Sequence, residues 1–181
     1  MPPHPTLGDC MRKIVLTFGL IAGVVMSGML VLTLPFQDQL GGGAGMAVGY
    51  ASMVLASLMI YFGIRQYRDN ECGGAIRFGQ AFKVGLLISA IAVACYVVTW
   101  EVVYTNFLPD FGDKYMAQML ERAREAGATA EQLATQAAEQ AEFWETYKNN
   151  ALVRMGFTAL EPLPVVLVFS LASAGLLRKK A

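Results

Sequence analysis

Residues 63–85, GIRQYRDNECGGAIRFGQAFKVG, decide how the rest of the chain is arranged. This segment carries four cations and two adjacent glycines, whereas the sequence on both sides of it is dominated by Leu, Ile, Val, Ala and Met. Paired glycines supply the backbone freedom that a tight turn needs. The segment therefore predicts a short polar hairpin between two apolar helices.

The composition explains why these helices are expected to lie in a membrane. Of the 181 residues, 55% are hydrophobic and only 15% are charged, with a formal net charge of zero. A soluble domain of this length needs a larger charged share. Four apolar runs, residues 14–34, 44–64, 84–104 and 152–177, are each long enough to cross a bilayer core of about 30 Å. The sequence therefore predicts an all-α, polytopic membrane protein with four transmembrane helices.

The polar segments complete the expected domain organisation. Residues 1–11 hold three prolines and the only histidine, and we expect them to form a disordered cytoplasmic tail. Residues 12–181 are then a single four-helix transmembrane domain. Residues 106–150, before the fourth transmembrane helix, are too polar for the bilayer but helical in composition. They predict a helical hairpin outside the cytoplasm.

Local signals divide this hairpin into two helices. Gly127 can end the first helix, and Thr129 with Gln132 fits a capping box at the start of the second. Three of its large side chains form the surface expected to meet a partner: Tyr115, Leu120 and Trp144.

The placement of cations predicts the orientation of the chain. Lys and Arg are enriched in cytoplasmic loops. The insertion at 106–150 carries eight carboxylates against four cations. Apart from Arg154, which lies within the fourth apolar run, the remaining cations precede the first run, lie between the second and third, or follow the fourth. They reach one side only if the chain crosses four times. Both termini are therefore expected in the cytoplasm. These cations are Arg12, Lys13, Arg65, Arg68, Arg77, Lys83, Arg178, Lys179 and Lys180.

The hairpin also contains a recognisable pattern. It combines a glycine–isoleucine pair, a tyrosine–arginine–aspartate triplet, paired glycines and a phenylalanine–glycine–x–alanine–phenylalanine box. The matching residues are Gly63, Ile64, Tyr67, Arg68, Asp69, Gly73, Gly74, Phe78, Gly79, Ala81 and Phe82. The chain thereby resembles, over residues 12–177, a bacterial domain-of-unknown-function family, number 4199. The resemblance implies four spans, a helical insertion before the last, and a bacterial origin, but no activity. We therefore expect the protein in the bacterial inner membrane.

The hairpin has two physical interpretations. Phe78 and Phe82 alternate with polar residues, as in a segment that lies among lipid headgroups, and Lys83 can extend its ammonium outward at the start of the next helix. The segment is then either a membrane-anchored turn or a docking site for a lipid headgroup or a partner.

Small residues predict how the apolar helices pack. Helices in lipid associate where Gly, Ala or Ser permits close backbone approach. Gly19, Gly23 and Ser27 make such a stripe on the first helix. Packing within one four-helix bundle is the first interpretation, and a homo-oligomer through a spare stripe is the second. The other helices carry further candidates: Gly45, Gly49, Gly85, Ser89, Ser170 and Ala174.

Three aromatic residues lie on one face of the third apolar helix. Tyr96, Trp100 and Tyr104 follow one another at intervals of four near its outer end. Amphipathic rings are enriched at the membrane–water interface. The spacing therefore predicts an aromatic belt that anchors the helix at this interface, in preference to a cation cage or a quinone-stacking site.

Two carboxylates, Glu101 and Glu161, enter the apolar runs, where charged groups are costly and often functional. Pro162 and Pro164 should break the fourth helix beside Glu161, a pattern seen at transporter binding sites. Alternatively, Pro162 starts the true span and Glu161 lies near the interface. Arg154 is a candidate to neutralise either carboxylate.

These residues predict a non-enzymatic protein. No histidine lies in an apolar run or in the insertion, which removes the usual acid–base pairs and metal ligand sets, so no catalytic residue, metal or cofactor is expected. No basic face suits nucleic acid. We expect a scaffold or accessory subunit whose partners are the lipid bilayer and a membrane protein or a second copy. The alternative is a small transporter or proton-linked channel that uses Glu161 and Glu101 near the broken helix.

Overall fold

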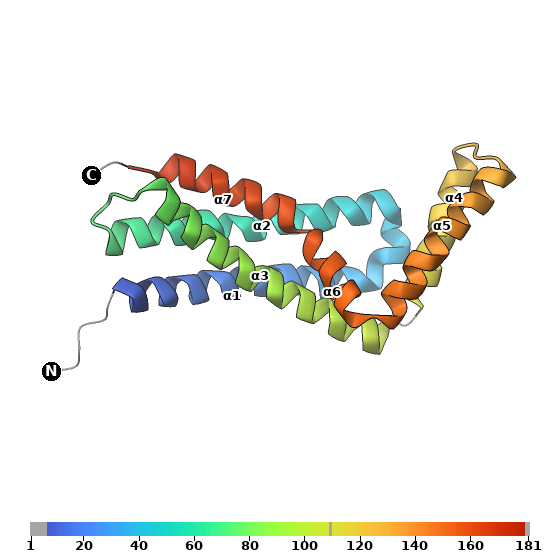
Figure 1. Cartoon of the computed structure of the whole chain (residues 1–181), viewed down its shortest axis with the longest axis horizontal. Coiled ribbons are helices and arrows are strands. Elements are labelled where there is room, and N and C mark those ends of the chain that lie inside the picture. Colours follow the sequence, from blue (N-terminus) through green and yellow to red (C-terminus); the bar gives the residue numbers. More distant parts are fainter. Residues whose placement is uncertain (1–6, 109, 180–181) are drawn as a thin grey trace. The chain divides into compact units, whose positions relative to one another are not determined.

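The computed structural model describes residues 7–108 and 110–179, with the backbone alone for residues 7, 35 and 37–46. Within these residues there are seven α-helices, one short 3-10 helix and no strand, which confirms the all-α fold class (Figure 1). In chain order they are α1 (Leu7–Thr33), η1 (Leu34–Phe36), α2 (Gln37–Glu71), α3 (Phe78–Phe107), α4 (Phe111–Glu125), α5 (Ala130–Asn149), α6 (Ala151–Leu160) and α7 (Leu163–Leu177).

Several of these helices are suited to cross a bilayer. By length and composition, three stretches of the described chain qualify: Gly8–Thr33, Ala47–Glu71 and Phe78–Phe107. There are four if α6 and α7, which are separated by a break at Glu161 and Pro162, together make one span. The apolar helices thus indicate a multi-pass membrane protein. The break itself is the one that the two prolines predict.

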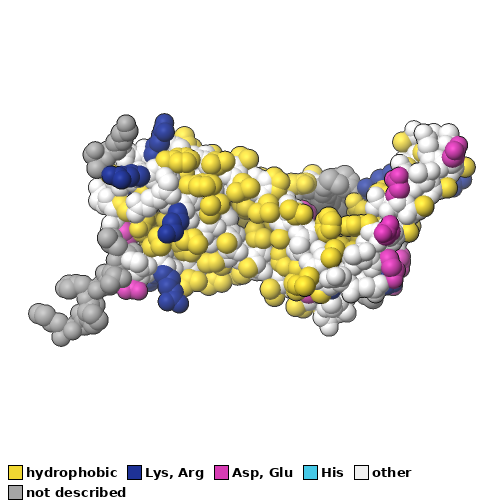
Figure 2. All heavy atoms as spheres, viewed as in Figure 1, with side chains coloured by type: hydrophobic (Ala, Val, Ile, Leu, Met, Phe, Trp, Pro, Cys, Tyr) yellow, Lys and Arg dark blue, Asp and Glu magenta, His cyan; other side chains and the backbone are white. Residues whose placement is uncertain are grey.

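The chain divides into two compact units. Unit 1 comprises residues 1–99 and 159–181, and unit 2 comprises residues 100–158. In unit 1, α1, α2, the first part of α3 and α7 lie side by side (Figure 1). Hydrophobic side chains cover the middle of these helices, and Lys and Arg side chains collect at the end where α1 begins (Figure 2).

The predicted small-residue stripe on the first helix lies where α1 contacts α3. A Cβ atom built on Gly19 would lie 2.7 Å from Cβ of Ile91, and one on Gly23 would lie 2.7 Å from Cβ of Cys95. Real Cβ atoms do not approach this closely, so only glycine lets α1 and α3 pack at this distance.

Hydroxyl groups add contacts between the same helices. Thr99 Oγ1 donates to Ser27 Oγ at 3.0 Å, and the hydroxyls of Ser89 and Ser170 lie 3.2 Å apart between α3 and α7. Gly49 does not take part in packing within the chain, because a Cβ there would meet nothing within 4 Å. The surroundings of Gly45 lie outside what the structure describes.

The connection between α2 and α3 is the predicted glycine turn. Gly73 and Gly74 have φ angles of +61° and +84°, values that residues with a side chain rarely adopt. The amide of Gly74 donates to the Arg68 carbonyl at 3.0 Å, which closes the end of α2. The hairpin in the opening segment is therefore confirmed.

The N-terminal expectation needs a correction. Residues 7–11, assigned to a disordered tail, are the first turns of α1. Asp9 lies in the first helical turn, where a carboxylate interacts favourably with the helix dipole. The rest of the tail, residues 1–6, and the cation Lys180 lie outside the described residues.

In unit 2, α4 and α5 form the predicted pair of helices. Gly127, with φ +90°, ends α4, and the amide of Ala128 donates back to the Ala123 carbonyl at 2.9 Å. Thr129 and Gln132 make the predicted capping box at the start of α5, each bonding the other's backbone amide.

Candidate functional site

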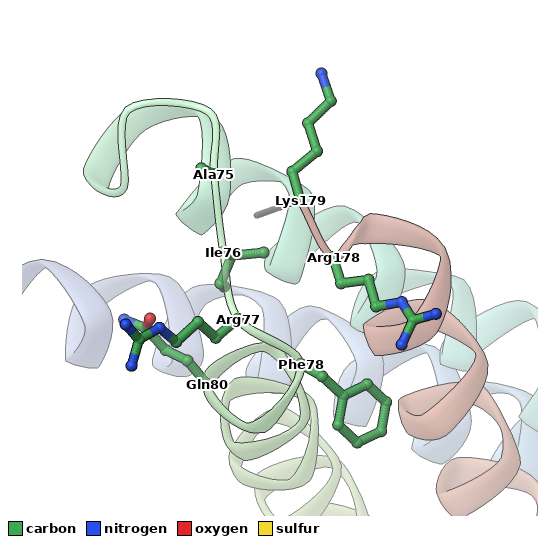
Figure 3. A pocket seen from close by; sticks show the side chains of 7 residues that line it. All are labelled: Ala75, Ile76, Arg77, Phe78, Gln80, Arg178 and Lys179. Atoms are coloured by element: carbon green, nitrogen blue, oxygen red, sulfur yellow. The ribbon is translucent and has the colours of Figure 1, made fainter. Parts of the chain in front are cut away.

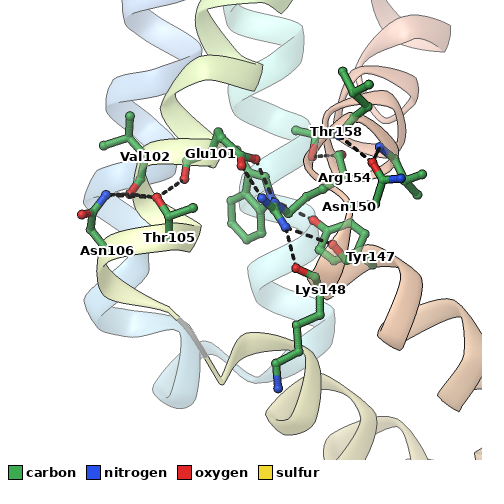
Figure 4. A network of polar contacts seen from close by, with 12 residues as sticks. Glu101, Val102, Thr105, Asn106, Tyr147, Lys148, Asn150, Arg154 and Thr158 are labelled. Atoms are coloured by element: carbon green, nitrogen blue, oxygen red, sulfur yellow. Dashed lines mark hydrogen bonds and ion pairs between the residues drawn. The ribbon is translucent and has the colours of Figure 1, made fainter.

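The structure pairs Arg154 with Glu101, one of the two carboxylates that the sequence offered. Arg154 Nε donates to Glu101 Oε2 at 2.8 Å, and Arg154 Nη2 donates to Glu101 Oε1. The contact is therefore bidentate and joins the end of α3 to α6 within unit 2 (Figure 4). Arg154 is only 5% exposed and the Glu101 side chain 17%.

The third nitrogen of the guanidinium is also hydrogen-bonded. Arg154 Nη1 donates to the carbonyls of Tyr147 and Lys148, at 3.0 and 3.2 Å, where α5 ends (Figure 4). Its Cζ lies 4.4 Å from the centroid of the Tyr104 ring, a cation–π contact. A buried charge is costly unless it is paired and hydrogen-bonded, and this one is both.

The sequence just before Arg154 explains its position in the first turns of α6. Asn150 caps α6 through its side-chain oxygen, which accepts from the amides of Leu152 and Val153 at 3.0 and 3.2 Å. The cap starts α6 directly after α5, so Arg154 follows one turn later. Thr158 Oγ1 then donates to the Arg154 carbonyl at 2.9 Å.

The aromatic residues of α3 are not the predicted lipid-facing belt. Tyr96, Trp100 and Tyr104 are all buried by other parts of the protein. Trp100 Nε1 donates to the Tyr147 hydroxyl at 2.8 Å, and the Tyr104 and Tyr147 rings meet edge to face at 5.7 Å. The belt prediction was wrong because the rings of Trp100 and Tyr104 are covered within unit 2.

Tyr147 is the central residue that sequence reasoning missed. It is the one buried residue of α5, and it bonds both Trp100 and Arg154. Burial raises the pKa of the Tyr147 phenol, because the charged phenolate would lose its hydration there. The available signal was its place three residues after Trp144, which continues the apolar stripe of this helix.

Further aromatic rings extend this centre towards α4. Gly112 faces Trp144, and a Cβ at that glycine would lie 2.9 Å from the indole ring. The rings of Phe111 and Trp144 are 6.2 Å apart, and those of Tyr115 and Trp144 are 5.5 Å apart. Among the described residues, the buried Nε1 of Trp144 has no hydrogen-bond partner.

The second carboxylate, Glu161, has a different environment in unit 1. It lies in the break between α6 and α7, next to the fully buried Pro162. Tyr96 donates its hydroxyl to Glu161 Oε2 at 3.0 Å, and Glu161 itself is exposed. Pro164 is exposed in the first turn of α7. Glu161 and Arg154 belong to different units, and the carboxylate bound to Arg154 is that of Glu101.

The hairpin motif residues collect at one end of unit 1. Arg68 Nε donates to Asp69 at 2.6 Å, and Arg68 Nη1 reaches the Leu177 carbonyl at 3.5 Å, where α7 ends. Tyr67 is buried and accepts a hydrogen bond from Gln80 at 3.2 Å. The side chain of Lys83 is exposed, Phe78 stacks on Phe82 with ring centroids 6.0 Å apart, and Gly79 has open space around it.

The two carboxylates therefore suit different chemistry. The Glu101 carboxylate is held by a permanent cation, so its charge stabilises the fold locally. The Glu161 carboxylate is exposed on the protein surface and accepts a hydrogen bond from a neutral hydroxyl, with no cation paired to it among the described residues.

Apolar helices of this number and length define an α-helical multi-pass membrane protein. The chain belongs to the family described as "Protein of unknown function (DUF4199)", whose pattern matches residues 17–179, nearly the whole chain. This confirms the resemblance found in the hairpin. No curated protein and no solved structure matches the chain.

Proposed function

We propose that this protein is a non-enzymatic scaffold or accessory subunit of the bacterial inner membrane, with four spans and both termini in the cytoplasm. The distribution of charge supports the orientation. The cationic hairpin between α2 and α3, the start of α1 and the end of α7 lie at one end of unit 1 (Figures 1 and 2). In this arrangement α6 and α7 count as one span, and α4 and α5 lie outside the cytoplasm.

The incomplete burial of the α4–α5 pair carries the proposal. Within α4, all of whose residues the structure describes, none is buried, and in α5 the buried residue is Tyr147. Met116, Met119, Leu120 and Leu133 remain only partly covered. Two helices cannot enclose an apolar seam, whereas a third helix laid along them can. We propose that a helix of a membrane-protein partner covers this seam.

The proposal is tested by purifying the tagged full-length protein in a mild detergent and identifying what co-purifies in stoichiometric amount. Leu120→Glu places a charge in the seam, and Gln118→Glu places the same charge at an exposed position of the same helix. We expect a foreign membrane protein to bind the wild type and Gln118→Glu but not Leu120→Glu. Circular dichroism and gel filtration check that both variants fold.

Two outcomes would contradict the proposal. A wild type that purifies only as a monomer or homo-oligomer contradicts the accessory role. A partner retained by Leu120→Glu would place the contact elsewhere and refute the role assigned to the seam.

The second candidate is a small transporter or proton-linked channel, and the exposed Glu161 at the helix break supports it. Because Glu101 is paired with Arg154, we assign the transport role in this candidate to Glu161 rather than to both carboxylates. The test is solute or proton flux in proteoliposomes. Transport predicts flux in the wild type that Glu161→Gln abolishes, and a wild type without flux under any imposed gradient argues against it.

A further inference from the structure

Two distant segments meet at the cationic end of unit 1. The amide of Lys179 donates to the Ile76 carbonyl at 3.1 Å, in an isolated antiparallel bridge. Ile76 and Leu177 are both buried, and Arg68 binds the Leu177 carbonyl. The start of α3 and the end of α7 are thus held together by backbone contacts and buried side chains.

A pocket of about 840 Å³ lies between these segments (Figure 3). Among the described residues, its lining contains three cations and no carboxylate. Phe78 and Arg178 lie on one side of the segment 76–78, Arg77 lies on the other, and Lys179 extends away from the ribbon (Figure 3). The lining residues are Ala75, Ile76, Arg77, Phe78, Gln80, Arg178 and Lys179.

The charges of this pocket are not neutralised by the described part of the protein. Arg65 and Arg68, at the end of α2, both contact Asp69. No described carboxylate lies within ion-pair distance of Arg77, Arg178 or Lys179. The field of these three cations is therefore available to an external anion.

An exposed aromatic side chain lines the pocket beside the cations, and an exposed leucine lies two residues before one of them in the sequence. Phe78 lines the pocket, is 40% exposed and stacks on Phe82. Leu176, two residues before Arg178, is 77% exposed. Cations next to exposed aromatic and aliphatic groups, at the end of apolar helices, match the boundary between headgroups and acyl chains.

We infer that the pocket formed by Arg77, Arg178 and Lys179 binds the phosphate group of an anionic phospholipid. Arg178 donates to phosphate oxygens in the forked geometry that suits a guanidinium, while Arg77 and Lys179, whose side chains point in other directions in Figure 3, add to the positive field around the pocket. Phe78 and Leu176 contact the first part of the acyl chains. An acidic protein segment would satisfy the cations but leave the exposed apolar groups in water, so lipid fits the site better.

The test measures binding of phosphatidylglycerol to the purified full-length protein in an uncharged detergent. Phosphatidylcholine serves as the neutral lipid, and glycerol 1-phosphate serves as the soluble phosphate ester. Native mass spectrometry counts bound lipids, and a thermal-shift titration gives relative affinities. We expect phosphatidylglycerol to bind in preference to phosphatidylcholine. The combined variant Arg77→Gln, Arg178→Gln, Lys179→Gln should weaken that binding about tenfold or more.

The matched control removes three cations elsewhere at the same end: Arg12→Gln, Lys13→Gln, Arg65→Gln. It has the same net charge as the pocket variant and should retain wild-type affinity. Equal losses in both variants would show diffuse attraction and overturn the site, as would a wild type without lipid preference. If glycerol 1-phosphate binds as tightly as the lipid, the pocket recognises a soluble phosphate ester and the assignment to a phospholipid is wrong. The single variant Arg178→Gln provides a second test if the triple variant fails to fold.

Discussion

Glu101 and Glu161 both lie in apolar stretches of the chain, yet their surroundings differ in almost every respect. Glu101 receives two charge-assisted hydrogen bonds from Arg154, whose other donors bind two carbonyls. Glu161 is exposed, with a single bond from the Tyr96 hydroxyl. The first carboxylate is part of a closed network and the second is not. A carboxylate in an apolar helix therefore suggests a function only once its partners are known.

Removing the cation of the closed network should have the largest effect. Arg154→Met leaves Glu101 without a counter-charge and two carbonyls without a donor. We expect the free energy of unfolding to fall by about 3–5 kcal/mol. Denaturant unfolding in detergent, with proteolysis of the α4–α5 pair as a local probe, measures it. Arg154→Lys keeps the charge but loses the forked contact. Its free energy of unfolding should therefore lie between those of the wild type and Arg154→Met. If Arg154→Met lowers the free energy of unfolding no more than Glu161→Gln does, Glu101 is not held more firmly than Glu161 and the contrast between the two carboxylates is wrong.

The two tryptophans of unit 2 allow a second comparison. Among the described residues, the indole N–H of Trp100 has a hydrogen-bond partner and that of Trp144 has none. Trp100→Phe removes the donor to Tyr147 and should cost roughly 1–3 kcal/mol beyond the loss of ring size. Trp144→Phe removes an N–H that has no partner among the described residues and serves as the matched control. The measurement is again unfolding in detergent, and equal costs would refute the importance of the Trp100–Tyr147 bond.

Glu161→Gln should have a small effect on stability. The amide oxygen can still accept from Tyr96 and the side chain is exposed, so a loss of less than about 1 kcal/mol is expected. A loss as large as that of Arg154→Met would show that Glu161 is held by contacts as extensive as those of Glu101.

The pH dependence of unfolding gives the smallest expected signal. The raised pKa of Tyr147 favours its protonated form in the folded state. Its contribution to stability is therefore complete below the ordinary tyrosine pKa of about 10 and is lost as pH rises through the folded-state value. Unfolding measured across the alkaline range should show this loss in the wild type and a weaker one in Tyr147→Phe. Identical alkaline profiles would contradict it.

The features that were predictable depend on neighbours in sequence. The glycine turn at Gly73 and Gly74, the capping box at Thr129 and the break at Pro162 each follow from a few adjacent residues, and the structure contains all three. The helical character of these segments likewise follows from the composition and periodicity of neighbouring residues.

The features that were missed depend on residues far apart. The sequence left Arg154 with two possible carboxylates, because periodicity along one helix does not determine which other helix it faces. Trp100 and Tyr104 were misread for the same reason. Their four-residue spacing predicts a shared face, whereas burial by Tyr147 depends on a helix that begins more than twenty residues later.

The separation of Glu101 and Arg154 in sequence also sets an order of events during synthesis. The arginine is added 53 residues after the glutamate. At translation rates of about 5–20 residues per second, the carboxylate exists for several seconds before its counter-charge is made. The final turns of α3 can thus reach their mature environment only after α6 has been synthesised, so this contact is among those that form late in biogenesis.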